Sequence, residues 1–372
     1  MTPRILIAPD SFKGSADADA VSRAIADGWN AVRPSDEVRR LPLADGGEGT
    51  VDAFLAGAPS AEHRTATVDG PDGSAVRARW AFLPEAEGGT AVVEVAETSG
   101  LGLLDPLLPL EAHTRGLGQL IAAAVRAGSK RVVVGLGGSA TSDGGSGALA
   151  ALGARFLDAH GRPVPPGNVG LGVIARVVLD GLPPAPPRGV TLMTDVRSPL
   201  LGPRGAARVF GPQKGATQAQ VNTLEANLAR FVDQVAAVRP GAVGLAEREG
   251  AGAAGGTGFG LLLWGAEIRP GADEIGRLLG LPQAVRAADL VITGEGRFDE
   301  QTHEGKVVSH VAALARAAGK PVSLVAGVLG IAPDGFADVV ELSALAHSAQ
   351  ASRADAVRWA RQAGEFLASR WG

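Results

Sequence analysis

The sequence predicts an α/β protein whose main domain is a doubly wound parallel sheet built from both ends of the chain, with a second α/β domain inserted. Apolar runs and helical patterns alternate over residues 4–57 and again from residue 290. That alternation is typical of a parallel sheet with helices on its faces. Between these segments, short strands are joined by Pro-Asp-Gly and Glu-Gly-Gly turns, which are typical of antiparallel hairpins.

The elements at the two ends of the chain share one pattern. Residues 4–9 (RILIAP) predict a buried strand, residues 16–32 have apolar positions at helical spacing, and residues 37–43 predict a second strand. In the last third, strands are predicted at residues 290–293, 321–326 and 338–342, and helices at residues 306–318 and 354–371. We therefore expect a Rossmann- or flavodoxin-like domain at residues 1–70 and 287–372, and an inserted domain at residues 71–286.

Composition excludes several classes of protein. Of the 372 residues, 45% are hydrophobic and 20% are charged, which predicts a globular protein with a large core. The net charge is −4 and no basic block is present, so binding to nucleic acid or to a membrane surface is not expected. The absence of cysteine excludes disulfides, thiolate zinc sites and a cysteine nucleophile. No targeting segment is visible, and a cytoplasmic location is the prediction.

Glycine-rich loops with acidic residues follow predicted strands at residues 10–15, 45–50, 135–145 and 294–299. Glycine lets backbone N–H groups approach a phosphate closely, and the amino terminus of a following helix favours an anion. Carboxylates beside such loops can hold Mg²⁺ or accept a proton from an attacking hydroxyl. The cations expected to neutralise phosphoryl charge are Lys13, Lys214, Arg297 and Lys306.

The most polar of these segments is residues 290–306, LVITGEGRFDEQTHEGK. Its apolar strand is expected to end in a loop that carries Glu295, Arg297 and Asp299, and a helix is expected to open at residues 305–306. In open α/β sheets, ligands bind beyond the carboxyl ends of the strands. We therefore predict that this loop binds an anionic ligand that bears a phosphate.

Seven ordered motifs resemble those of the class I bacterial glycerate kinases. They are APDSFKGS (8–15), PLADGGEGT (42–50), GLGGSATSDGG (135–145), TDVRSPLLGPRGA (194–206), VFGPQKGA (209–216), GAAGG (252–256) and ITGEGRFDEQTHEGK (292–306). The sequence departs from the family at Ser142 and Ser198, where Asn is frequent, and at residues 307–310, where Pro and Gly are usual. None of these departures removes an acid or a lysine from the motifs.

The resemblance implies ATP-dependent phosphorylation of D-glycerate with Mg²⁺, in a two-domain α/β protein with the active site in the cleft between the domains. It also implies that the C2 hydroxyl is the acceptor and that 2-phosphoglycerate is the product. The expected partner is therefore the small molecule D-glycerate, without nucleic acid or membrane. A monomer or a homodimer is predicted.

The residue types leave several catalytic assignments open. Asp195 follows a predicted strand of the inserted domain and is a candidate base or Mg²⁺ ligand; Asp10 and Asp45 are rival candidates, although either could instead cap a helix. Lys13 is placed with the catalytic residues, and Glu295 joins Asp195 as a predicted metal ligand. The residues predicted to bind glycerate are Ser11, Glu295, Arg297 and Asp299. Those predicted to bind the nucleotide phosphates are Gly46, Gly47, Glu48, Gly137, Gly138, Ser139, Thr141, Lys214 and Lys306.

Other functions remain compatible with parts of the sequence. The spacing of Gly135, Gly137 and Ala140 after a strand fits the relaxed dinucleotide fingerprint, with Asp158 near the ribose-binding distance, so an NAD-dependent dehydrogenase is one alternative. A glycerate 3-kinase, which gives 3-phosphoglycerate, is another. A non-catalytic regulator that binds sugar acids is a third, although it would not need lysines and carboxylates around a phosphate.

Overall fold

The computed structural model describes residues 2–300 and 306–371, and the described residues divide into two compact units. The first unit comprises Met1–Asp45, Asp52–Pro59 and Pro270–Gly372, and the second comprises Gly46–Val51 and Ser60–Arg269. These bounds differ from the predicted ranges, 1–70 with 287–372 and 71–286. The difference arises because the glycine loop 46–51 packs within the second unit, whereas the segment that follows Arg269 packs against strands and helices of the first.

The first unit contains a parallel sheet. Its described strands are β1 (Arg4–Ile7), β2 (Glu37–Arg40), β11 (Leu290–Phe298), β12 (Val322–Leu329) and β13 (Val339–Glu341). Its described helices are α1 (Ala18–Val32), α2 (Thr50–Gly57, from Asp52 onward), α11 (Gly271–Leu278), α12 (Leu281–Ala287), α13 (Val307–Ala317), α14 (Leu342–Leu345), α15 (Ala349–Ala354) and α16 (Ala356–Arg370). The sheet order is β13-β12-β11-β1-β2, and each neighbouring pair is parallel. The predicted doubly wound fold is therefore confirmed.

The strand order reverses between β1 and β11. From β1 the chain proceeds to β2 on one side, with Ile5 opposite Val38, whereas β11 pairs with the other side of β1, with Ile5 opposite Leu290. From β11 the chain continues outward to β12 and β13. Ligands of doubly wound sheets bind at such a reversal, beyond the carboxyl ends of the strands.

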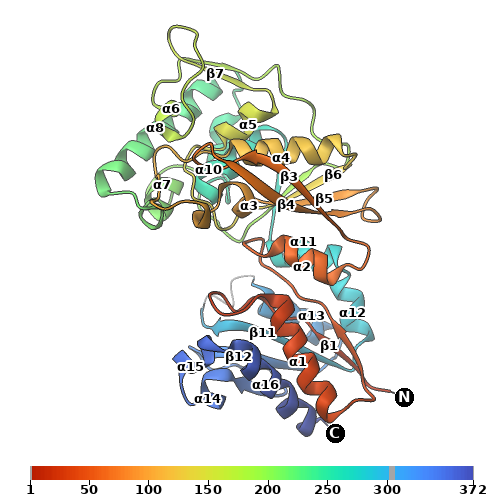
Figure 1. Ribbon diagram of the computed structural model, residues 1–372. Coiled ribbons are helices and arrows are strands. Elements are labelled where there is room, and N and C mark those ends of the chain that lie inside the picture. The colour runs from red at the N-terminus through yellow and green to blue at the C-terminus, as the bar shows by residue number, and fades with distance from the viewer. Residues whose placement is uncertain (1, 301–305, 372) are drawn as a thin grey trace. The chain divides into compact units, whose positions relative to one another are not determined.

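Helices from the two ends of the chain cover one face of this sheet together. In Figure 1, α1 (red) lies alongside α16 (dark blue), and these helices make extensive contact. A Cβ atom on Gly28 of α1 would lie 1.9 Å from the carbonyl oxygen of Arg361, and one on Gly364 of α16 would lie 2.2 Å from that of Ile25. Because no side chain fits at either position, the backbones of α1 and α16 approach each other directly.

Strand β11 is longer than predicted. The segment 294–298, which we expected to be part of a loop, is strand and pairs with β12, with Gly294 opposite Val325. A Cβ atom on Gly294 would lie 2.3 Å from the Val325 carbonyl oxygen, and one on Gly327 would lie equally close to that of Gly296. The glycines thus allow close pairing of β11 and β12 rather than forming a turn, and the loop prediction was wrong for these residues.

The second unit contains a mixed sheet. Its described strands are β3 (Glu62–Asp69), β4 (Ala75–Leu83), β5 (Thr90–Glu94), β6 (Arg131–Gly135), β7 (Arg155–Leu157), β8 (Arg176–Val178), β9 (Val190–Met193) and β10 (Glu267–Arg269). Its described helical segments are α3 (Ala96–Ser99), η1 (Leu101–Leu103), α4 (Arg115–Arg126), α5 (Ser146–Leu152), α6 (Asn168–Leu171), α7 (Ala206–Phe210), η2 (Pro212–Lys214), α8 (Gln218–Ala236), α9 (Ala242–Ala246) and α10 (Ala253–Leu263). The main sheet has the order β10-β9-β6-β5-β4-β3, and a small hairpin joins β7 to β8. The predicted antiparallel hairpins are confirmed by the pairing of β4 with both β3 and β5.

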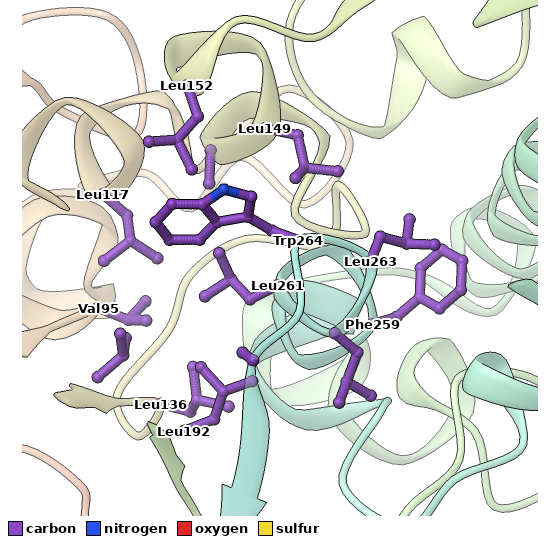
Figure 2. Close-up of a cluster of buried hydrophobic side chains, with 14 of the residues drawn as sticks. Val95, Leu117, Leu136, Leu149, Leu152, Leu192, Phe259, Leu261, Leu263 and Trp264 are labelled. Atoms are coloured by element: carbon purple, nitrogen blue, oxygen red, sulfur yellow. The ribbon is translucent and has the colours of Figure 1, made fainter. Parts of the chain in front are cut away.

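A buried cluster around Trp264 packs the helices of the second unit onto this sheet. Figure 2 shows the indole of Trp264 among leucines of α4, α5 and α10, including Leu117, Leu149 and Leu261. The indole N–H donates to the Pro183 carbonyl oxygen at 2.8 Å, so its polar atom is satisfied. In the described part of the chain, no helix has both the length and the apolar character needed to cross a membrane.

Candidate active site

A cavity of about 420 Å³ lies in the first unit, where the sheet order reverses. Its lining comes from the segments after β1 and β2, from the ends of β11 and β12, from the residue before α13, from α15 and from the start of α16. The predicted site residues that line it are Asp10, Ser11, Lys13, Asp45, Glu295, Arg297, Asp299 and Lys306. The fold therefore brings residues from both ends of the chain to one pocket.

Asp10 is the buried acid at the centre of this arrangement. Its backbone N–H donates to the Gly294 carbonyl oxygen at 2.8 Å, which extends the pairing of β1 with β11, and only 5% of the residue is exposed. Its Oδ1 atom accepts a hydrogen bond from the Ser11 N–H at 2.6 Å. Burial raises the pKa of Asp10 to about 7, the Asp45 and Glu295 carboxylates act in the same direction, and the Ser11 N–H and Lys13 oppose them. A carboxylate with such a pKa can accept a proton near neutral pH.

Two cations of the pocket, Lys13 and Arg297, form ion pairs in which the basic side chain is largely exposed. Lys13 Nζ lies 3.0 Å from Asp45 Oδ2, and 71% of the lysine side chain is exposed. Arg297 Nε lies 3.2 Å from Asp299 Oδ2, and 61% of the arginine side chain is exposed. Exposed pairs of this kind contribute little to stability, so their cations can turn to a bound anion at low cost.

The residue before α13 and two residues of α15 also line the pocket. Lys306 immediately precedes α13, and Ser352 and Arg353 lie on α15. Residues 301–305 of the polar segment predicted to bind the ligand, together with the predicted helix start at Gly305, lie outside the described residues. The sequence prediction missed Ser352 and Arg353 because they belong to no glycine loop and follow no apolar strand.

The predicted phosphate loops of the second unit are held by one another and by Glu94. The Gly137 N–H donates to the Gly46 carbonyl oxygen at 3.3 Å, and a Cβ atom on Gly137 would lie 2.4 Å from the Gly47 Cα atom. Glu94, which ends β5 and is buried, accepts hydrogen bonds from the N–H groups of Gly49 and Val51. An acid at the end of an apolar strand was the signal that identified Asp10 and Asp45, and it could have identified Glu94.

Lys214 is buried beneath the loop 135–145. Only 2% of it is exposed, and its Nζ atom donates to the Thr141 carbonyl oxygen. Burial lowers the pKa of Lys214 to about 7, although the Asp143 carboxylate acts in the opposite direction. In this structure the ammonium group therefore contacts the loop backbone rather than solvent.

Asp143 organises the same loop. Its carboxylate accepts hydrogen bonds from the Thr114 N–H and hydroxyl at 2.9 and 2.8 Å, and from the Gly145 and Gly147 N–H groups at 3.1 Å. Ser139 and Thr141, predicted to bind phosphate, are buried, and their hydroxyl oxygens lie 3.0 Å apart. Many polar groups of this loop thus form hydrogen bonds that stabilise the conformation of the loop itself.

The remaining predicted residues also lie in the second unit. Asp195 follows β9 and is half-buried, so it does not line the pocket of Asp10. The predicted metal ligands Glu295 and Asp195 belong to different units. Across residues 2–300 and 306–371, no group of three or more acidic or histidine side chains has metal-binding geometry.

A pocket of buried acids and exposed cations at the reversal of a doubly wound sheet is typical of an α/β enzyme that acts on a small anionic molecule. The model of the glycerate kinase family matches residues 5–371. The chain belongs to this family, and it is a kinase. The dehydrogenase alternative is thereby set aside.

Similar proteins span nearly the whole chain. A glycerate kinase of Bacillus subtilis (strain 168) is 44% identical over 329 residues, which cover 87% of this chain and 85% of the relative. A glycerate 2-kinase of Escherichia coli (strain K12) is 41% identical over 330 residues, covering 88% and 85%. A crystal structure from Salmonella typhimurium LT2, described as a candidate glycerate kinase 2, superposes with a TM-score of 0.84 at 36% identity and covers 99% of both chains.

Proposed function

We propose that the protein transfers the γ-phosphoryl group of ATP to the C2 hydroxyl of D-glycerate with the help of Mg²⁺, and that 2-phosphoglycerate is the product. Family membership supports glycerate as the substrate, and the relative from Escherichia coli named glycerate 2-kinase supports the C2 position. The observation that carries the proposal is the pocket in which buried Asp10 lies near Lys13 and near residues of β11.

In this proposal Asp10 is the general base. The glycerate hydroxyl oxygen attacks the γ-phosphorus atom, its proton passes to the Asp10 carboxylate, and ADP leaves. A base is most effective when its pKa lies near the working pH, and burial raises the pKa of Asp10 to about 7. Asp195 and Asp45, the rival candidates from the sequence, are more exposed than Asp10.

The pocket offers carboxylate oxygens, the type of ligand that Mg²⁺ prefers, although no three of the described acidic side chains have metal-binding geometry. Asp10, Asp45 and Glu295 bring negative charge together, and their repulsion contributes to the raised pKa of Asp10. Mg²⁺ commonly binds through one or two carboxylates and the phosphates of its substrate. Glu295 and Asp195 are the ligands proposed for it. The ion would supply positive charge to the phosphate oxygens.

The glycine loops of the second unit are proposed to bind the nucleotide phosphates. The residues assigned to this role are Gly46, Gly47, Glu48, Gly137, Gly138, Ser139 and Thr141. Because Glu94 already occupies the N–H groups of Gly49 and Val51, the phosphates would be bound by the earlier part of the loop 46–51. Lys214 would act on them through the loop that it supports, and Lys306 is proposed to contact them directly.

The choice between the hydroxyl groups follows from how the carboxylate is held. If a cation binds the carboxylate, the C2 hydroxyl is one carbon away and its position is closely fixed. The C3 hydroxyl has one more rotatable bond, so orienting it costs additional entropy. Phosphorylation at C2 brings phosphoryl charge near the carboxylate, and the several cations of the pocket would offset that repulsion.

The product distinguishes the 2-kinase from the 3-kinase. Purified protein, ATP, Mg²⁺ and D-glycerate should give a product that enolase consumes without phosphoglycerate mutase, and its ³¹P NMR spectrum should match 2-phosphoglycerate. A product that enolase alone cannot consume would identify a 3-kinase. Excess chelator should abolish turnover, and full activity in its presence would disprove the role of Mg²⁺.

A further inference from the structure

Helix α15 supplies the pocket with an arginine that no sequence motif contains. Arg353 lines the cavity beside the buried Ser352 of the same helix. The helix is fixed at its start, where the Ser348 hydroxyl accepts a hydrogen bond from the Ala351 N–H at 3.3 Å. The Trp359 indole N–H, from α16, donates to the Ala351 carbonyl oxygen at the same distance. Arg353 therefore extends from a supported position.

Arg353 differs from Lys13 and Arg297, two other cations of the pocket, in its ion pairing. Lys13 is paired with Asp45 and Arg297 with Asp299. Within residues 2–300 and 306–371, Arg353 has no acidic side chain within ion-pair distance and no side-chain hydrogen bond. A planar guanidinium group can bind a carboxylate through two parallel hydrogen bonds. Arg353 is thus the pocket guanidinium that can bind an incoming carboxylate without first leaving a protein partner.

We propose that Arg353 binds the carboxylate of the organic-acid substrate and makes the enzyme select an acid over its neutral analogues. The inference rests on the proposed function, because it assumes that the pocket binds glycerate. It assigns the carboxylate to α15 and leaves Lys13 and Arg297 for the phosphoryl charge. Arg353 is then a specificity-determining residue, whereas Asp10 is the proton acceptor.

The test compares D-glycerate with D-glyceramide, in which a neutral amide replaces the carboxylate. In Arg353→Gln the KM for D-glycerate should rise about 10- to 100-fold, the range expected when a hydrogen-bonded charge pair is lost. The kcat/KM for D-glyceramide and the KM for ATP should not change, so the preference for the acid should collapse. Arg353→Lys should restore part of it, because lysine keeps the charge but not the planar pair of donors.

Arg316→Gln is the matched control, because Arg316 is an exposed arginine of α13 that does not line the pocket. It should leave all of these constants unchanged. An Arg353→Gln variant that keeps its preference for the acid, or that loses glycerate, glyceramide and ATP binding equally, would overturn the inference. Calorimetric titration of D-glycerate into wild type and Arg353→Gln tests binding separately from turnover. Wild type that binds D-glycerate but phosphorylates neither hydroxyl would refute the proposed function and not the role of Arg353.

Discussion

The two units use buried ionisable groups in opposite ways. In the first, Asp10 is buried beside other acids in a pocket, and its pKa is raised. In the second, Asp143 and Lys214 are buried as well, but the carboxylate accepts hydrogen bonds from N–H and hydroxyl groups, and the lysine donates one to a loop carbonyl oxygen. Satisfied buried groups fix a shape, whereas an acid crowded by other acids is prepared for a reaction. We therefore expect mutations in the first unit to affect chemistry more than stability, and mutations in the second to do the reverse.

The largest expected effect is that of Asp10→Asn. Loss of the proposed base should lower kcat by about 100- to 10,000-fold, the usual contribution of general-base catalysis. The fold should be retained, because the neutral amide removes a crowded buried charge. Steady-state kinetics measures the loss of kcat, and circular dichroism checks that the fold is retained. Near-normal kcat in a folded Asp10→Asn variant would move the base to Asp45 or Asp195.

Lys214 and Asp10 should give stability profiles of opposite slope against pH. Folding lowers the pKa of Lys214 from 10.5 to about 7, so between these values the unfolded state binds more protons and stability rises with pH. Folding raises the pKa of Asp10 from 3.8 to about 7, so over that range the folded state binds more protons and stability falls as pH rises. Each full change corresponds to about 4 to 5 kcal/mol, since one pKa unit corresponds to about 1.4 kcal/mol.

Urea denaturation of wild type, Lys214→Met and Asp10→Asn across pH measures this contrast. The stability of wild type relative to Lys214→Met should increase from pH 7 toward pH 10, and its stability relative to Asp10→Asn should decrease from pH 4 to pH 7. Parallel profiles for wild type and Lys214→Met would show that the lysine keeps its proton in the folded protein, and would contradict the contrast between the units.

Asp195 tests whether the second unit contributes a reacting group as well as loops. If Asp195 holds Mg²⁺ or accepts the proton, Asp195→Asn should lower kcat at least about 100-fold in a protein that still folds. A loss that excess Mg²⁺ partly restores would identify a metal ligand. Unchanged kcat would mean that the reacting groups belong to the first unit alone, and the difference between the two units would be larger.

The smallest expected effect on stability is that of Lys13→Ala. The Lys13 side chain is 71% exposed, so loss of its ion pair with Asp45 should change the free energy of unfolding by less than about 1 kcal/mol. Activity should nevertheless fall, because the cation is proposed to bind phosphoryl charge. Thermal unfolding and kinetics on the same preparation check both statements. A marked loss of stability would mean that the ion pair supports the pocket.

Local patterns were enough to predict the strands and helices that surround the pocket. The apolar run before Asp10, the helical spacing after it and the acid at Asp45 are each contained within a few residues. The pairing of Ile5 with Leu290 is not contained in any local pattern, since it joins distant parts of the chain. The sequence thus indicated a doubly wound domain from both ends, and the structure supplied the strand order that places the pocket.

The failures have physical causes. Glycines at the end of β11 were interpreted as a turn, because the close approach of the Val325 carbonyl group that requires them comes from another strand. Arg353 lies in a short, alanine-rich helix, and only the packing of α15 brings it to the cavity. The phosphate-binding role predicted for Lys214 stays a prediction, and its burial was not visible in the sequence.

The reciprocal glycine contact between α1 and α16 has a consequence for biosynthesis. Strand β1 and helix α1 leave the ribosome early, but β11 and α16, which cover them, are made last. The second unit is nearly continuous from Ser60 to Arg269 and can fold while the first unit is still incomplete. For most of translation, the apolar faces of β1 and α1 therefore lack their native partners. Exposed apolar surface of this kind promotes aggregation, so we expect chaperones to bind the amino-terminal segment of the nascent chain.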